Sequence, residues 1–143
     1  MWRTKRLQQL STERRCSYMS AKPTDLARIQ EIYDVIVQTQ RQLGALSFDK
    51  ARFLHPGNDQ DEVLAEGFMN RVLRVTEEVG RLDDELASSY GFNTAGASGV
   101  RNRLAHAYGD VDAEIIWAVI EREFDALLSS CRRYCDDVGV DLE

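Results

Sequence analysis

Residues 59–86, DQDEVLAEGFMNRVLRVTEEVGRLDDEL, decide the fold of this chain, because their apolar side chains recur at steps of three and four residues. That spacing places the apolar side chains along one face of a helix. They are Leu64, Phe68, Val72, Val75, Val79, Leu82 and Leu86. Asp59 followed by Glu62 resembles a capping arrangement, so we expect the helix to begin there.

Two further segments, one on each side of this helix, carry the same period. The first begins at Thr24 or Asp25, and its stripe consists of Leu26, Ile29, Tyr33, Ile36, Gln40 and Leu43. The second can be capped by Asp112, and its stripe consists of Ile116, Ile120, Phe124, Leu127, Cys131, Tyr134 and Val138. Residues 48–54 can add a short helical turn before His55-Pro56-Gly57-Asn58 breaks the chain.

The pattern as a whole predicts an all-α fold. No segment combines sustained alternation of apolar and polar residues with enrichment in β-branched side chains, so no sheet is expected. The helical segments, with one more around residues 100–108, predict an antiparallel bundle of four to five helices.

The composition indicates one soluble domain. A chain of 143 residues can bury its own core, and it contains no apolar run long enough to cross a membrane. Cys131 and Cys135 lie four residues apart on a predicted helix and have no obvious disulfide partner, which predicts reduced thiols and a cytoplasmic protein. A structural zinc site needs about four converging ligands, and only His55 and His106 could join the three cysteines, so we expect neither metal nor cofactor.

The net charge of −6 argues against a surface that coats nucleic acid without specificity, because that mode of binding needs many cations against phosphates. Residues 1–20 hold five basic residues and one acidic residue, a net charge of +4, so −10 remains for residues 21–143. An acidic body of this kind favours a basic partner, or a basic patch confined to a cleft.

Residues 1–20 are predicted to be a poorly ordered basic tail, and residues 21–143 to be the helical domain, because the tail has no sustained apolar stripe. Met19 looks like a natural start of the chain, so residues 1–18 could come from an upstream start codon or from an expression vector. The alternative is that residues 1–20 form a short RNA-binding arm, since cations in a flexible segment attract phosphates.

The stretch RNRLAHAY, residues 101–108, brings a permanent cation, an imidazole and a phenol together within eight residues. An arginine presents a planar fork of donors that matches a phosphate, and a histidine exchanges a proton readily near pH 7. These groups suit chemistry on a phosphodiester and suggest cleavage of RNA. On a helix, Arg101 and Tyr108 share one face, while Asn102 and His106 share the adjoining one.

The same stretch resembles the Arg-x4-His-x-Tyr motif of HEPN-domain proteins, and within them the HepT-like toxins of toxin–antitoxin pairs. The resemblance continues through Gly109-Asp110-Val111-Asp112 and a helix that soon contains Trp117, and it extends more weakly from about Asp25 to Val138. Residues 91–100 depart from the family, whose approach to the arginine is often apolar with Trp and Pro. The resemblance implies a bundle of HEPN type, paired motifs at a homodimer interface, and metal-free cleavage of RNA.

Cleavage by the neighbouring 2′-hydroxyl needs a base, an acid and a cation for the charged intermediate, and one histidine cannot fill both proton roles at once. Two copies meeting across a two-fold axis would supply Arg101 and His106 twice, in one composite cleft. We therefore expect Arg101 to hold phosphate and His106 to transfer protons, with Asn102 orienting the imidazole or the scissile group.

The resemblance also implies regulation at Tyr108, because in HepT-like toxins a minimal nucleotidyltransferase antitoxin transfers AMP to the matching tyrosine. AMP on this phenol would place an anionic phosphate against the guanidinium of Arg101. The alternative function is a helical binding module without catalysis that partners a nucleotidyltransferase. We expect the remaining conspicuous side chains to be structural, with Trp117 in the core and Asp83-Asp84-Glu85 on a solvated helix face.

Overall fold

A computed structural model describes residues 23–93 and 112–142 of the chain. In these two ranges the chain forms helices and no strand. The helices are α2 (Pro23–Ala45), α3 (Lys50–Leu54), α4 (Asp59–Gly80), α5 (Asp84–Tyr90), α7 (Ala113–Arg122) and α8 (Phe124–Val138). The prediction of an all-α fold is therefore confirmed, whereas the predicted boundary between a tail and a domain at residue 20 lies outside the described residues.

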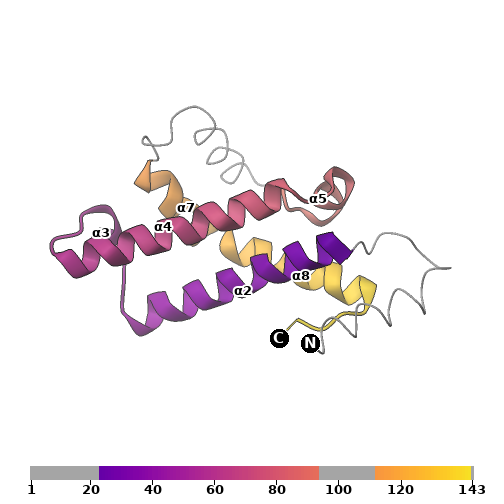
Figure 1. Ribbon diagram of the computed structural model, residues 1–143, viewed down its shortest axis with the longest axis horizontal. Coiled ribbons are helices and arrows are strands. Elements are labelled where there is room, and N and C mark those ends of the chain that lie inside the picture. Colours follow the sequence, from indigo (N-terminus) through magenta and orange to yellow (C-terminus); the bar gives the residue numbers. More distant parts are fainter. Residues whose placement is uncertain (1–22, 94–111, 143) are drawn as a thin grey trace.

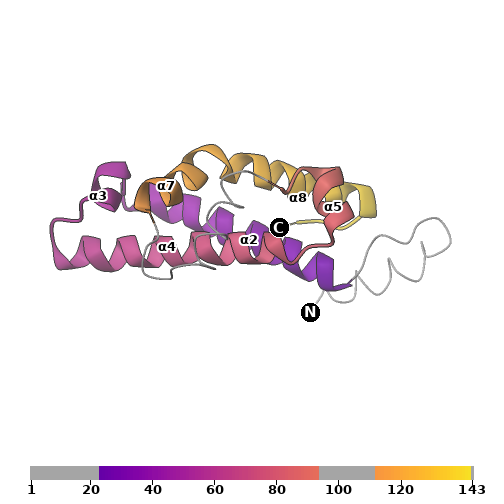
Figure 2. The same cartoon turned by 90° about the horizontal axis from the view of Figure 1, so that it is seen from above.

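The helices form two layers (Figures 1 and 2). Helices α2 and α4 lie side by side and run in opposite directions in one layer, and α5, α7 and α8 make the other. Helix α2 packs against both α4 and α8, and it is antiparallel to both. The short α3 packs against α4 and α7 at the opposite end of the molecule from α5. The antiparallel packing expected from the sequence thus holds around α2.

Helix α2 buries a broader face than its predicted stripe. Ile29 and Ile36 are completely buried as expected, but Ile32 and Thr39, which lie outside the stripe, are completely buried as well. The hydroxyl of Thr39 donates a hydrogen bond to the Val35 carbonyl at 2.7 Å, which satisfies it inside the core. The face is broad because α2 has a packing neighbour on each of two sides.

Helix α4 ends at Gly80, six residues before the predicted end of the apolar stripe at Leu86. The amide of Arg81 donates to the Glu78 carbonyl at 3.1 Å and the amide of Leu82 donates to the Val79 carbonyl at 3.2 Å, which tightens the last turn. The chain then begins α5 at Asp84. Leu82 and Leu86 are nevertheless buried, so the apolar period was right and the continuity of the helix was wrong.

Two other predicted helix boundaries need correction. The N-cap of α4 is Asn58 and not Asp59, because the Asn58 side chain accepts the Asp61 amide hydrogen at 2.8 Å. The predicted last helix is two helices, α7 and α8, which meet at Glu123. Its predicted stripe is buried from end to end, and Asp112 caps α7 as expected, accepting from the Glu114 amide at 2.9 Å.

A single arginine ties the α2–α3 corner to α4. The guanidinium of Arg52 donates to both carboxylate oxygens of Asp61, at 2.7 and 3.2 Å, and lies 4.8 Å above the ring centre of Phe48. It also donates to the carbonyls of Leu46 and Ser47, at 2.9 and 3.1 Å. Two charge-assisted hydrogen bonds from one guanidinium to one carboxylate stabilise the contact and also fix the relative orientation of the two side chains. The hydrogen bonds from Arg52 hold the pKa of the Asp61 carboxyl below its ordinary value.

Trp117 and the two C-terminal cysteines are core residues. The ring of Trp117 lies 5.3 Å from that of Phe53, which joins α7 to α3 and confirms its predicted packing role. Cys131 and Cys135 are both buried and both free. Burial raises the pKa of the Cys135 thiol to about 12 and also raises the pKa of Cys131, so both thiols are protonated at neutral pH.

Over residues 23–93 and 112–142, no helix is both long and apolar enough to cross a membrane.

We predict that Asp61→Asn destabilises the protein at pH 7, because the lowered pKa of Asp61 means that its ionised form is favoured in the folded state. This stabilisation is complete above the ordinary pKa of 3.8 and is lost as the pH falls through the lower pKa of the folded state. Urea denaturation at pH 7 and at pH 3 measures the difference. Asp59→Asn is the control, because Asp59 shares the first turn of α4 but not the Arg52 hydrogen bonds. Equal losses in the two variants would contradict the prediction.

Candidate functional site

The predicted site residues Arg101, Asn102, His106 and Tyr108 lie between the two described ranges, so their roles remain predictions. The described structure shows the residues on either side of this segment. One end follows α5 and the other leads into α7.

Helix α5 ends in a left-handed turn that delivers the chain into the core. Gly91 has a φ of 78°, a conformation that favours glycine because it has no Cβ. Phe92 follows and is completely buried, with its amide donating to the Ala87 carbonyl at 2.9 Å. The buried ring of Phe92 therefore anchors the chain two residues before the segment that contains the motif.

The same end of α5 is held against α8 by polar contacts. The hydroxyl of Tyr90 donates to the Asp137 carboxylate at 2.7 Å, and Arg133 donates to the Tyr90 carbonyl at 2.8 Å. The rings of Tyr90 and Tyr134 meet edge to face, with their centres 5.1 Å apart. These contacts couple the start of the motif segment to the last helix of the bundle.

The other end of the segment is anchored by α7. Asp112 caps this helix, and Ile116 and Val119 behind it are completely buried. Lys50 and Glu114 form an ion pair of 3.4 Å between α3 and α7, although both side chains are half exposed and such a pair contributes little. The segment between the two described ranges, residues 94–111, thus lies between helices that share one core.

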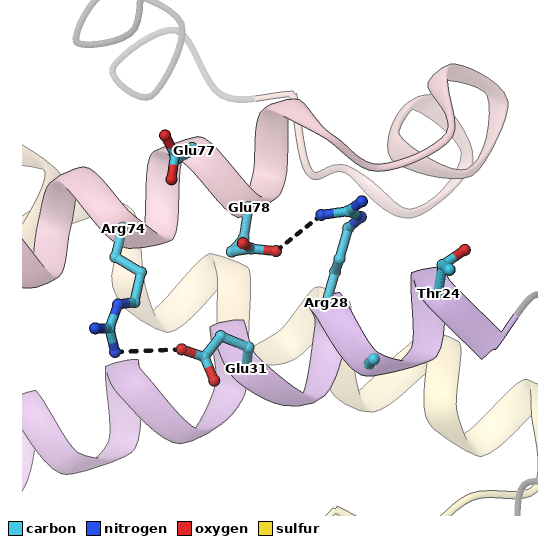
Figure 3. A pocket seen from close by; sticks show the side chains of 7 residues that line it. Thr24, Arg28, Glu31, Arg74, Glu77 and Glu78 are labelled. Atoms are coloured by element: carbon cyan, nitrogen blue, oxygen red, sulfur yellow. Dashed lines mark hydrogen bonds and ion pairs between the residues drawn. The ribbon is translucent and has the colours of Figure 1, made fainter.

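Outside the motif, the described residues form an open polar groove between α2 and α4, with a volume of about 530 Å³ (Figure 3). Its lining residues are Thr24, Ala27, Arg28, Glu31, Arg74, Glu77 and Glu78. Two ion pairs connect α2 and α4 across this groove. Arg28 of α2 pairs with Glu78 of α4 at 3.2 Å. In the second pair the arginine is on the other helix, and Arg74 of α4 pairs with Glu31 of α2 at 3.3 Å. These pairs were not predicted from the sequence, because their members lie 50 and 43 residues apart and leave no local signal.

The carboxylates and thiols of the described residues do not gather into a metal site. No group of three or more His, Cys, Asp or Glu side chains in residues 23–93 and 112–142 has the required proximity. In the acidic run at residues 83–85, the Asp83 carboxylate accepts the Leu86 amide hydrogen and begins α5, which gives this residue a structural role.

Comparison with known proteins gives a family match. The model of a family described as HepT-like, "Ribonuclease HepT-like", matches residues 58–134, which is more than half of the chain. The match begins at the N-cap of α4, ends within α8 and includes the Arg101–Tyr108 stretch. No curated protein and no solved structure matches the chain.

We predict that Gly91→Ala lowers the free energy of unfolding by about 1–2 kcal/mol, because a Cβ makes the left-handed conformation unfavourable. Steric clash is not the cause, since the nearest side-chain atoms would lie 3.6 Å from the new Cβ. Gly57→Ala is the matched control, because its Cβ would meet open space and its φ is not positive. Urea denaturation measures both, and a loss of equal size in the two variants would show that the turn after α5 imposes no special conformation.

Proposed function

Because this chain belongs to the HepT-like ribonuclease family, we propose that it is a metal-independent endoribonuclease toxin paired with a minimal nucleotidyltransferase antitoxin. Family membership implies the coarser function, a ribonuclease that acts on RNA. One observation supports the finer proposal. The family match covers Arg101, His106 and Tyr108, and these residues have the spacing of the Arg-x4-His-x-Tyr motif.

In the proposed reaction, the 2′-oxygen of one nucleotide attacks its own 3′-phosphorus. A base removes the 2′-hydroxyl proton, the bond from phosphorus to the 5′-oxygen of the next nucleotide breaks, and an acid protonates that leaving oxygen. The products are a 2′,3′-cyclic phosphate and a 5′-hydroxyl end. The step is an internal transesterification, so it requires neither a metal-bound water nor a redox partner.

Two copies of the chain supply the groups for this reaction. His106 of one copy acts as base and His106 of the other as acid, while the Arg101 guanidiniums neutralise the charge that develops on the phosphate oxygens. Asn102, four residues before His106, orients the imidazole or the scissile group. The homodimer is therefore part of the catalytic mechanism that we propose.

The charge distribution supports a local RNA site. Residues 21–143 carry −10, so a long stretch of RNA laid over the body would meet repulsion, whereas a cleft with two Arg101 side chains can hold one phosphodiester. We expect few phosphate contacts and hence a shallow dependence of binding on salt concentration.

We predict that His106→Ala lowers the rate of RNA cleavage about 10²- to 10⁴-fold, which is the usual contribution of a positioned acid or base. The measurement is cleavage of total RNA in the presence of a chelator, with identification of the new ends. His55→Ala is the matched control, because His55 is the only other histidine and lies exposed at the C-cap of α3. We expect this control to cleave at the wild-type rate.

Three results would contradict the nuclease proposal. They are wild-type protein that leaves RNA intact, His106→Ala protein that cleaves at the full rate, and products that end in a 3′-hydroxyl. Intact RNA together with tight binding to a nucleotidyltransferase would instead identify the chain as a non-catalytic partner module.

We also propose that the antitoxin silences the enzyme by transferring AMP to the Tyr108 hydroxyl, with pyrophosphate leaving from ATP. Tyr108 lies seven residues after Arg101, almost two helical turns, so the added phosphate can pair with that guanidinium and occupy the substrate position. The phosphate of the modified residue then competes directly with RNA.

We predict that Tyr108→Phe retains RNA cleavage but is not silenced by the nucleotidyltransferase and ATP, because it has no acceptor hydroxyl. Intact mass before and after incubation, together with residual cleavage, measures both effects. Tyr33→Phe serves as the control, since Tyr33 packs beneath Arg132 with 5.5 Å between guanidinium carbon and ring centre, far along the chain from the motif. Modification of the Tyr108→Phe protein to the wild-type extent would place the acceptor elsewhere.

A further inference from the structure

The C-terminal end of α5 is attached to α8 through the last residue of α5, at the place where the two helices pack together (Figure 1). This residue, Tyr90, donates its hydroxyl hydrogen to the Asp137 carboxylate at 2.7 Å and accepts a hydrogen bond from Arg133 on its carbonyl at 2.8 Å. Arg133 and Asp137 are four residues apart, and therefore lie on one face of α8. We call Tyr90, Arg133 and Asp137, together with Ser130, the α5–α8 clamp.

Arg133 acts on the peptide group that leads out of α5. The carbonyl that it binds belongs to the peptide group between Tyr90 and Gly91, and a peptide group is rigid and planar. The same Nη2 atom donates to the Ser130 hydroxyl at 3.2 Å and would lie 3.6 Å from a Cβ placed on Gly91. The guanidinium is thus held beside Gly91, where the left-handed turn begins, and it fixes the orientation of the peptide group before that turn.

The clamp is not what holds α5 in the core. Leu86, Ala87 and Phe92 are buried, and they attach α5 and the following turn to the rest of the bundle. The side chains of Arg133 and Asp137 are exposed, and hydrogen bonds and charge contacts at the surface contribute little to the free energy of unfolding. The main effect of the clamp is therefore on the direction of the chain where it leaves α5.

This direction matters because glycine allows many backbone orientations, so Gly91 turns the chain freely unless its neighbours restrain it. The chain continues from Gly91 through Phe92 into the segment that contains the motif. In catalysis, a displacement of about 1 Å in the reacting groups can lower a rate about 10²-fold, even when the change is made far from the chemistry.

We propose that Arg133, supported by the hydrogen bond between Tyr90 and Asp137, is a positioning residue for RNA cleavage. It orients the chain that enters the motif segment and does not itself bind RNA. This inference rests on the proposed function, and it extends the machinery of that reaction to the last helix of the bundle, outside the motif.

The test measures cleavage of a short single-stranded RNA by full-length protein in excess over RNA. It gives the rate constant at saturation, the protein concentration that gives half of this rate, and the fraction of protein that is active. Arg133→Met removes the hydrogen-bond donors and keeps a long side chain. We expect its rate constant at saturation to fall about 10- to 100-fold, with the half-saturating concentration unchanged. Arg133→Lys keeps a cationic donor and should recover part of the loss.

Arg132→Met is the matched control. Arg132 is the neighbouring exposed arginine of α8, but its guanidinium lies over the ring of Tyr33 in α2. We expect this variant to cleave at the wild-type rate.

A double-mutant cycle tests the second part of the clamp. Tyr90→Phe removes the hydroxyl and keeps the ring that packs on Tyr134, and Asp137→Ala removes the acceptor. Each variant should lower the rate constant by the same factor, and the double variant should lower it no further, because both changes remove one hydrogen bond.

The outcomes separate positioning from other roles, with urea denaturation measured on every variant. A lower urea midpoint and a smaller active fraction at an unchanged rate constant would show that the clamp only stabilises the fold, and would overturn the inference. A higher half-saturating concentration at an unchanged rate constant would identify Arg133 as a phosphate contact, and would also overturn it. Wild-type cleavage by Arg133→Met would overturn the inference and leave the proposed function standing. Wild-type protein that leaves RNA intact would overturn the proposed function, and the inference with it.

Discussion

Three isoleucines of α2, Ile29, Ile32 and Ile36, are completely buried, and no single neighbouring helix can cover the broad face that they create. Covering it requires α4 on one side and α8 on the other. Burying a side chain of this size contributes about 1.5–3 kcal/mol, so the positions of both neighbours are strongly constrained. The helices that follow α4 and precede α8 are α5 and α7, which hold the two ends of the motif segment. In this HepT-like ribonuclease, the burial of α2 thus constrains the positions of the two helices that flank residues 94–111.

Much of this fold could be predicted from the sequence, because apolar period and burial are closely linked. Every predicted core residue of the last two helices is buried, and so are Leu82 and Leu86 beyond the end of α4. The breaks at residues 81–83 and at Glu123 were missed, since the apolar stripe continues through both without a change of phase. What ends α4 is backbone geometry, in which the amides of Arg81 and Leu82 donate to carbonyls three residues earlier, and no residue type in the sequence indicates it.

The candidate site, too, could be predicted from the sequence only in part. The Arg101–Tyr108 stretch was recognisable because it is local, and the family match over residues 58–134 agrees with that recognition. The polar contacts between the described helices are not local. Arg133 reaches the Tyr90 carbonyl across 43 residues, and Arg28 reaches Glu78 across 50, so only the folded chain brings them together. The spacing of residues in a sequence can identify reactive groups, whereas contacts between residues far apart in the sequence are seen only in the folded chain.

The burial of Cys131 and Cys135 affects how readily their thiols are oxidised. Burial raises the pKa of the Cys135 thiol to about 12, so the thiol is protonated at neutral pH, whereas the thiolate is the form that peroxides and electrophiles attack. Cys131 is better shielded still, with its sulfur 3.7 Å from the Ile29 carbonyl in the centre of the bundle. Oxidation of these two sulfurs would therefore first require the bundle to open.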